Sequence, residues 1–335
     1  MNKLKFSHSA MTTYEQCPKM YYLKYIEGIK PLAINSPLFF GSAIDEALSA
    51  MLMQKKFNPS QEELDVVYKS SPEQEFIKRF THDQDGVFLP TNEHCSYFQS
   101  DFDRELLTEE DWKELMEFDK DITSFDAFFE GCREDFKAKR VLNLEDQKTF
   151  NFMCWLSLKR KGLLMIQAYR EQIYPEIYEV FDIQKDILLP NDNGDLIRGK
   201  IDFIASFNDQ PATKYICDNK TSSKPYSEDS VSISDQLAIY CEAEGYYTAA
   251  YCVVEKKLRV KEPRVRANII KDTIKEENVQ KTFDKADSIM HNIADGCFDG
   301  LDNNKKCNFF GKRCNFYSYC WGNKDMTGLI KKEIK

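Results

Sequence analysis

The sequence lacks four features: a long apolar run, a secretory signal, a nucleotide-binding loop and a positive net charge. No window approaches the roughly 18 to 20 apolar residues of a membrane span, and the opening MNKLKFSHSAMTTYEQC has no apolar run of a signal peptide's length. We therefore expect a cytoplasmic protein, from a bacterial, archaeal or phage-infected cell, with no membrane partner. Because there is no G-x-x-x-x-G-K-[ST] loop, which binds the phosphates of a nucleotide, any nucleotide-driven motor must come from a partner chain. With a formal net charge of −9, contacts with nucleic acid must come from local basic patches.

Cysteine is plentiful, with eleven residues, an odd number. In a reducing cytoplasm, clustered cysteines indicate metal ligands before they indicate disulfides. The densest cluster is CNFFGKRCNFYSYC near the C-terminus, which holds Cys307, Cys314 and Cys320. Three thiols this close predict a metal site and raise the question of where a fourth ligand lies.

The first half of the chain has helical periodicity. Residues 7–27 predict two helical pieces, the first capped by a serine and the second opened by Pro18. Residues 40–54 predict a further helix with one apolar face. Residues 60–165 are charged, aromatic and mostly helical in pattern, without strand alternation, which indicates a helical insertion.

Strand patterns begin near residue 177. Three strands are predicted, with the turn signal NDNGD between the first two, followed by a helix, a segment that ends as a strand, and a late amphipathic helix. These elements cover residues 177–190, 196–207, 212–222, 232–246, 246–261 and 278–296.

Two of these strands carry residues with metal-binding chemistry. Asp218 and Lys220 lie two apart on one strand and so project from the same face. If this strand forms a hairpin with the preceding one, Asp202 reaches the same point. Two carboxylates beside a lysine suit Mg²⁺ or Mn²⁺, which acidify a bound water and stabilise a leaving oxygen. The lysine can position or deprotonate that water and offset transition-state charge. For a motif this short, an ordinary surface ion pair is the alternative.

Further short motifs flank these strands in a fixed order: GSAID, GKID, DNK and QLAIY. The last places Gln236 and Tyr240 four apart, on one face of a helix. This ordered set resembles the RecB-type branch of the PD-(D/E)-x-K nuclease superfamily, in which G-x-x-x-H is followed by G-x-x-D, (D/E)-x-K and Q-x-x-x-Y. The matching residues are Gly41 with Asp45, Gly199 with Asp202, Asp218 with Lys220, and Gln236 with Tyr240.

Asp45 departs from the family pattern, because it stands where the family has a histidine. A carboxylate still suits Mg²⁺ or Mn²⁺, so we expect retained activity with an altered metal preference; loss of activity is the alternative. Glu46 is a poorer substitute for the histidine, because it faces about 100° away on the helix.

The resemblance implies an α/β, restriction-endonuclease-like core with a small mixed central sheet flanked by helices. It also implies a metal-dependent DNA nuclease, an exonuclease that acts on single-stranded DNA or DNA ends. Asp45, Asp202 and Asp218 would hold Mg²⁺ or Mn²⁺, Lys220 would position the water, and Gln236 and Tyr240 would complete the catalytic set. The domains expected are N-terminal helices of the nuclease core at 1–50, a helical insertion at 51–164, the nuclease core at 165–296 and a C-terminal iron–sulfur lobe at 297–335.

Several members of this branch carry an iron–sulfur cluster: the AddB-type recombination nucleases, the CRISPR-associated spacer-processing exonucleases and a eukaryotic replication helicase–nuclease. In them one cysteine lies near the N-terminus before a proline, and three follow the nuclease core, ending in C-x5-C. Cys17 in YEQCPKMYY matches the first, and Cys314 with Cys320 match the final pair. Cys307 lies seven residues before that pair, where the family's cysteine lies three before.

The resemblance therefore implies a [4Fe–4S] cluster held by Cys17, Cys307, Cys314 and Cys320. A four-cysteine Zn²⁺ site is the chemical alternative, and unrelated buried thiols are a third. A cluster at these cysteines would tie the first helices to the last segment of the chain and so contribute to folding.

DNA is the expected partner, and the basic segment KKLRVKEPRVRANIIK, residues 256–271, predicts contacts with its phosphates. Two other functions remain open. One is the nuclease subunit of a larger recombination or spacer-acquisition complex, with a helicase or an integrase as partner. The other is a catalytically inactive iron–sulfur scaffold that binds DNA. Asp45 favours the scaffold, whereas the intact Asp202, Asp218 and Lys220 argue against it.

Overall fold

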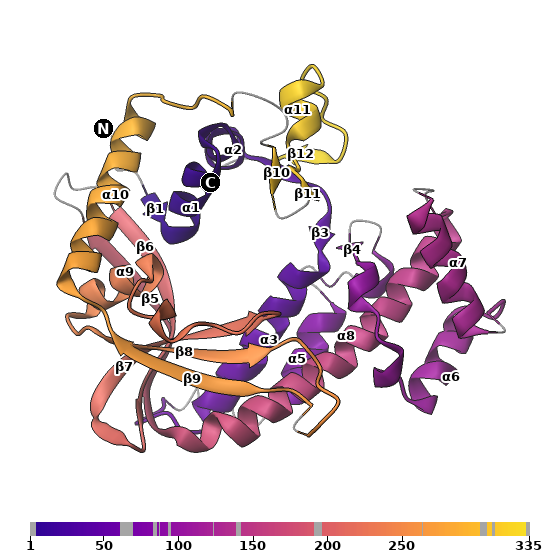
Figure 1. Ribbon diagram of the computed structural model, residues 1–335, viewed down its shortest axis with the longest axis horizontal. Helices are drawn as coiled ribbons and strands as arrows, with labels where there is room; N and C mark the ends of the chain where they lie inside the picture. Colours follow the sequence, from indigo (N-terminus) through magenta and orange to yellow (C-terminus); the bar gives the residue numbers. More distant parts are fainter. Residues whose placement is uncertain are drawn as a thin grey trace.

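A computed structural model shows a central mixed sheet flanked by helices (Figure 1). The predicted α/β class is confirmed. No helix within the described part of the chain is long and apolar enough to cross a membrane. The structure describes residues 5–60, 70–82, 86, 88–92, 95–122, 124–138, 142–190, 196–262, 264–301, 307–309 and 312–332.

The sheet is built on the long antiparallel pair β5 and β6. Along the other edge of β6, β1 pairs in parallel with its first residues and β7 pairs antiparallel with its last. β7 and β8 are parallel, so the chain must cross over between them, and α9 (Asp235–Glu244) makes that crossover. β9 closes the sheet antiparallel to β8. The strands are β1 (Lys5–Ser7), β5 (Ile177–Pro190), β6 (Leu196–Phe207), β7 (Gln210–Ser222), β8 (Thr248–Glu255) and β9 (Ala267–Thr273).

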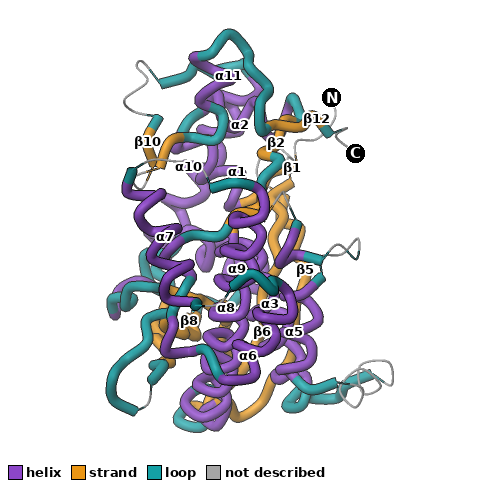
Figure 2. The backbone as a smooth tube through the Cα atoms, turned by 90° about the vertical axis from the view of Figure 1, so that its right-hand side faces the viewer, coloured by secondary structure: helices purple, strands orange, loops and turns teal. Residues whose placement is uncertain are grey.

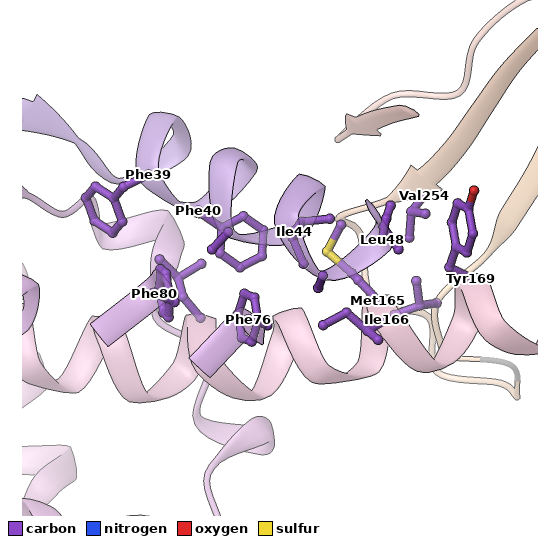
Figure 3. Close-up of a cluster of buried hydrophobic side chains, with 14 of the residues drawn as sticks. Phe39, Phe40, Ile44, Leu48, Phe76, Phe80, Met165, Ile166, Tyr169 and Val254 are labelled. Carbon is purple, nitrogen blue, oxygen red and sulfur yellow. The ribbon is translucent and has the colours of Figure 1, made fainter. Parts of the chain in front are cut away.

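Each face of the sheet has its own apolar core, because successive strand residues point to opposite faces. On β7, Cys217 belongs to the core covered by α3, α5 and α8, whereas Ile216 belongs to the core covered by α1, α9 and α10. Figure 3 shows the first core, where buried side chains of α3, α5 and α8 interdigitate. The covering helices are α1 (His8–Gln16), α3 (Ser36–Met53), α5 (Pro72–Thr81), α8 (Leu144–Gln172) and α10 (Glu276–Ala294).

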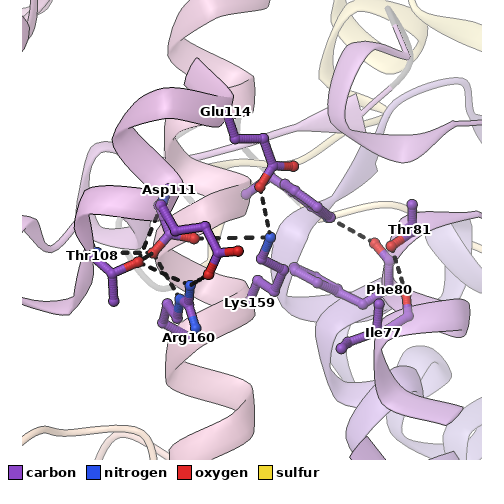
Figure 4. A network of polar contacts seen from close by, with 10 residues as sticks. Ile77, Phe80, Thr81, Thr108, Asp111, Glu114, Lys159 and Arg160 are labelled. Atoms are coloured by element: carbon purple, nitrogen blue, oxygen red, sulfur yellow. Dashed lines mark hydrogen bonds and ion pairs between the residues drawn. The ribbon is translucent and has the colours of Figure 1, made fainter. Parts of the chain in front are cut away.

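The predicted helical insertion contains α5, α6 (Glu109–Phe118) and α7 (Phe125–Lys137) and is joined to the core through α8. α6 is fixed to α8 by a buried acid: Asp111, 1% exposed, accepts hydrogen bonds from Arg160 and Thr108 (Figure 4). α8 runs continuously across the expected boundary at residue 164. The division into domains stays a prediction.

The last strand of the described chain pairs with a segment near its beginning. β2 (Ile29–Pro31) pairs antiparallel with β12 (Leu329–Lys331), and Figure 2 shows α2 (Pro18–Tyr21) and α11 (Tyr317–Trp321) at the same end of the molecule. Ser7 caps α1 by accepting a hydrogen bond from the Ala10 N–H, and Pro18 opens α2. The two predicted helical pieces are thereby confirmed. The remaining short strands are β3 (Ile34–Asn35), β4 (Cys95–Ser96), β10 (Asn308–Phe309) and β11 (Lys312–Arg313).

One strand was misplaced by the sequence pattern. Residues 246–261 were expected to end as a strand, whereas β8 occupies Thr248–Glu255 and the basic residues after it leave the sheet. The physical reason is that β7, its parallel partner, ends at Ser222, opposite Glu255. The predicted NDNGD turn, residues 191–195, lies outside the described residues.

Candidate active site

A β-hairpin brings two of the predicted acids together. β6 and β7 pair antiparallel with Phe203 opposite Cys217, which places Asp202 beside Asp218. The carboxylate of Asp202 accepts a hydrogen bond from the backbone N–H of Asn219 over 2.8 Å. Asp218 is only 2% exposed. The approach of Asp202 to Asp218 was predicted on condition that the two strands form a hairpin, and that hairpin is present.

The third acid, Asp45, lies on α3, which packs against β5. Its charge acts on both Asp218 and Asp202. The Nε2 atom of Gln184, on β5, donates hydrogen bonds to the Asp45 carboxylate at 3.2 Å and to the Ser49 hydroxyl at 3.3 Å. Three carboxylates from three separate elements therefore share one region of the molecule.

Lys220 is held by a chain of polar contacts that runs from β7 to α9. Its ammonium lies 2.5 Å from Asp218 Oδ2 and donates to Gln236 Oε1 over 3.0 Å. Gln236 in turn donates through Nε2 to Asp218 Oδ1 at 2.9 Å and to the Tyr240 hydroxyl at 3.0 Å. Gln236 and Tyr240 are one helical turn apart, as the sequence spacing predicted. The four side chains form one connected network.

Gly199 is needed where β6 passes Tyr240. A Cβ atom at position 199 would lie 2.6 Å from Cε1 of the Tyr240 ring and 3.2 Å from Cγ1 of Ile187. Real Cβ atoms essentially never come within 3.0 Å of another heavy atom, so a side chain at position 199 would collide with the Tyr240 ring. The glycine of GKID therefore leaves room for the Tyr240 ring, which is 5% exposed, in the position from which its hydroxyl meets Gln236.

The electrostatics of the three acids fit a divalent cation. Burial and the negative charge of Asp218 raise the pKa of Asp45 to about 6. Burial and the charges of Asp218 and Asp45 raise the pKa of Asp202, and burial raises that of Asp218, although Lys220 partly offsets this effect. Buried carboxylates that repel one another are the ligands that a hard cation such as Mg²⁺ or Mn²⁺ stabilises in their charged form.

Lys220 is positively charged in this arrangement. Burial alone would lower the pKa of its ammonium, but the adjacent Asp218 carboxylate outweighs burial and raises that pKa above its ordinary value. In this state Lys220 supplies a positive charge and a hydrogen-bond donor rather than a base.

Two residues near the site were not found from the sequence. His8, at the start of α1, lines a cavity of about 600 Å³ together with Gln236, Tyr240 and Lys200, and it interacts electrostatically with Asp218 and Lys220. Burial lowers the pKa of His8, which favours the neutral imidazole. Gln184 was the other omission. Neither residue belongs to a short motif, so no spacing signal marks it.

The four predicted cluster cysteines line a second cavity, of about 610 Å³. Cys17 comes from the junction of α1 and α2, and Cys307, Cys314 and Cys320 come from the C-terminal segment. Burial and the neighbouring thiols raise the pKa of Cys320 to about 11. The indole N–H of Trp321 donates a hydrogen bond to Cys307 Sγ across 3.3 Å.

Convergence on one cavity fits the chemistry of a four-thiolate group, and it includes Cys307 despite its unusual spacing. However, neither the three acids nor the four cysteines have their donor atoms as close together as in a bound metal centre. Within the described residues no three His, Cys, Asp or Glu side chains are close enough to form a metal-binding group. The ligand roles of the three acids and the four cysteines therefore stay predictions.

Comparison with known proteins agrees with the architecture at the level of the superfamily. The sequence profile of the PD-(D/E)XK nuclease superfamily matches residues 5–321. No curated protein matches the chain. A solved chain named "Crystal structure of SSO0001" is 14% identical, with 65% of this chain and 98% of that chain covered at a TM-score of 0.28, too low to carry an argument. The profile match spans nearly the whole chain, from β1 to α11. On that basis this protein belongs to the PD-(D/E)XK nuclease superfamily, whose members are metal-dependent nucleases.

Proposed function

We propose that this chain is a DNA exonuclease that hydrolyses phosphodiester bonds in single-stranded DNA or at DNA ends with Mg²⁺ or Mn²⁺. The observation that carries the proposal is the meeting of Asp45, Asp202 and Asp218 beside Lys220. Asp45 comes from the helix that bears the family's histidine, and its position among the other acids supports a ligand role. That position favours an active enzyme over an inactive scaffold.

In this proposal each residue of the site has its own role. The three carboxylates hold the cation, which when bound would acidify a water and stabilise the leaving oxygen. Lys220 directs its ammonium at the attacking water or at the charge that develops on the phosphate. Gln236 fixes the ammonium by accepting its hydrogen bond and holds Asp218 by donating to it. Tyr240 anchors Gln236 in turn.

The test is degradation of end-labelled DNA by anaerobically purified protein with Mn²⁺. Wild type is compared with Lys220→Met and with Lys281→Met, because Lys281 is an exposed lysine of α10. We expect wild type and Lys281→Met to degrade single-stranded DNA or duplex ends, and Lys220→Met to lose at least about a hundredfold in kcat. Melting temperatures establish that each variant is folded.

Two results would contradict the proposal. Closed circular DNA cut as fast as linear DNA would make the enzyme an endonuclease. If wild type is folded, cuts no DNA, and shows no Mn²⁺ site in calorimetry that disappears in Asp202→Asn, the inactive scaffold would replace the nuclease.

We further propose that Cys17, Cys307, Cys314 and Cys320 bind a [4Fe–4S] cluster. Their shared cavity supports this, because it joins the first helices to the end of the described chain. Iron content and visible absorption of Cys17→Ser and Cys307→Ser are compared with those of Cys297→Ser, an exposed cysteine that does not line the cavity. We expect iron loss and a lower melting temperature in the first two alone. Zinc in place of iron, or equal iron in all three variants, would refute the assignment.

A further inference from the structure

A third cavity, of about 780 Å³, lies where the helical insertion meets the core. Its walls come from the first residues of α3, the segment Gln99–Asp101, the middle of α8, and the chain that follows β7 and β8. Neither the superfamily match nor the proposed mechanism assigns it a role.

The cavity is positively charged. Lys161, Lys256 and Lys257 line it, and within the described part of the chain none of the three forms an ion pair. By contrast, other basic residues of the predicted segment 256–271 are paired, Arg259 with Glu255 at 2.9 Å and Lys271 with Asp209. Three lysines against a single lining acid, Asp101, in a chain of net charge −9 indicate a site for an anionic ligand.

One acid also lines the cavity, and its carboxylate is already engaged. Oδ2 of Asp101, a residue 9% exposed, accepts hydrogen bonds from the Ser36 hydroxyl at 2.5 Å and from the Phe98 N–H at 2.7 Å. Asp101 therefore braces the wall, and its charge acts on Lys161 and Lys256. The lining still carries three ammonium groups against one carboxyl group. α3 begins at the same wall, and its N-cap residue, Asn35, makes no side-chain capping hydrogen bond. The positive end of the α3 dipole thus adds to the charge of the lysines.

The lining suits a phosphate better than a base. Ser100 and Ser223 offer hydroxyl groups and Gln99 an amide. Two aromatic residues line the cavity: Phe40, beneath Lys256, is 2% exposed and offers no face for stacking, and Phe98 is half-buried. Lysine ammonium groups with hydroxyl and amide donors are typical of contacts with the nucleic-acid backbone.

The cavity lies beside two of the elements that carry the candidate active site, β7 and α3. Ser223, the residue directly after β7, follows Lys220 by three residues, about 10 Å at the rise of a strand. Phe40 precedes Asp45 by five residues along α3, about 7.5 Å at the rise of a helix. A stacked strand carries one phosphate per roughly 3.4 Å of its length. The distance therefore corresponds to about two to three nucleotides.

We propose that the cavity lined by Lys161, Lys256 and Lys257 binds a backbone phosphate of the DNA strand, about two to three nucleotides from the bond that is cut. The proposal rests on the proposed nuclease function for the identity of the strand. It gives the helical insertion a role, because Lys161 of α8 supplies one side of the site.

The first test measures binding without catalysis. Fluorescence anisotropy with a labelled 20-nucleotide single strand, in EDTA, compares wild type with Lys161→Met, Lys256→Met and the control Lys281→Met. Methionine keeps the apolar stem of the lysine and removes its charge. We expect Lys161→Met and Lys256→Met each to weaken binding about tenfold. The slope of log K against log salt should fall by about 0.7 in each. Lys281→Met should match wild type.

A conservative substitution distinguishes weaker binding caused by the lost charge from weaker binding caused by disturbed folding. Lys256→Arg keeps the positive charge and should bind within about threefold of wild type. Unchanged affinity and salt slope in both methionine variants would overturn the proposal. So would equal losses in Lys256→Arg and Lys256→Met at unchanged melting temperatures.

The second test uses substrate length. With Mn²⁺, Lys256→Met should raise KM for the 20-nucleotide strand at unchanged kcat, and should leave cleavage of a dinucleotide unaltered, because a dinucleotide cannot span the active site and the cavity. An equal effect on both substrates would refute phosphate binding at a distance. If wild type cuts nothing, the nuclease proposal fails, while the anisotropy measurement still decides whether these lysines bind the strand.

Discussion

The amide group of Gln184 donates a hydrogen bond to Asp45 across 3.2 Å, from a backbone whose φ is +53°. Gln184 lies within β5, between Ile183 and Lys185, whose partners on β6 flank Asp202. A left-handed backbone conformation costs a residue with a side chain roughly 1–2 kcal/mol. Strain of this kind is concentrated at functional sites, and here it accompanies a contact with a candidate metal ligand.

Replacement of Gln184 separates the strain from the hydrogen bond. Gln184→Ala and Gln184→Gly both lose the contact with Asp45, but only glycine adopts the left-handed conformation without strain. We expect the glycine variant to exceed the alanine variant by about 1 kcal/mol in free energy of unfolding, measured with urea. Both should bind Mn²⁺ more weakly than wild type in calorimetry. An alanine variant as stable as the glycine variant would show that the conformation carries no strain.

Asp45→Asn should stabilise the metal-free protein and remove its response to metal. Burial and the charge of Asp218 raise the pKa of Asp45 to about 6, so at pH 7.5 the native state carries a carboxylate that its surroundings disfavour. Neutral asparagine should raise the free energy of unfolding in EDTA by about 1–2 kcal/mol. Wild type should gain about 2.7 kcal/mol when Mn²⁺ reaches a hundredfold excess over Kd, and Asp45→Asn should gain far less. Glu46→Gln, at an exposed neighbouring position, should respond to Mn²⁺ as wild type does.

The sequence predicted those parts of the site that depend on local periodicity. Asp218 and Lys220 share a strand face, and Gln236 and Tyr240 share a helix face, because these spacings match the periods of the elements. Gln184 was out of reach, since its role depends on a positive φ that glutamine does not favour. The position of Lys161 in the cavity, where it forms no ion pair with any described residue, could not be predicted either, because ion pairing between distant segments depends on packing rather than on a local pattern.

The helical insertion should be sensitive to acid through Asp111. Burial alone would raise the pKa of this carboxyl group, but hydrogen bonds from Arg160 and Thr108 outweigh burial and hold the pKa below its ordinary value of 3.8. In the unfolded chain Asp111 takes up a proton near pH 4, whereas in the native state it stays charged. The stability from these contacts is therefore complete above about pH 4 and is lost as the pH falls through the lower native pKa.

Asp111→Asn tests this predicted direction of the pH dependence of stability. At pH 7 it should lower the free energy of unfolding by about 2–4 kcal/mol, because it breaks a largely buried ion pair. The gap between wild type and variant should narrow when urea unfolding is repeated near pH 3.5. Glu110→Gln, at an exposed partner of Arg160 with a distance of 4.0 Å, should show little change at either pH. A gap for Asp111→Asn that stays constant with pH would contradict the assignment.

Gly199→Ala should disturb catalysis through the Tyr240 ring. The new methyl group would lie 2.6 Å from Cε1 of that ring, so the ring must move away from the hydroxyl position at which it meets Gln236. Overpacking of this kind costs about 1–3 kcal/mol in stability. The displaced Gln236 would hold Lys220 and Asp218 less well, which should lower kcat more than it changes KM.

A double-mutant cycle assigns the effect to this contact. Tyr240→Ala removes the ring and its hydrogen bond, so Gly199→Ala should cost little further kcat in that background. If the two losses instead add fully, the methyl group acts elsewhere, and the tips of Ile187 at 3.2 and 3.3 Å become the cause. Strong coupling, of about 1 kcal/mol or more, would establish that GKID and QLAIY act as one unit: the glycine of the first makes room for the tyrosine of the second, and the tyrosine fixes the glutamine that holds Lys220.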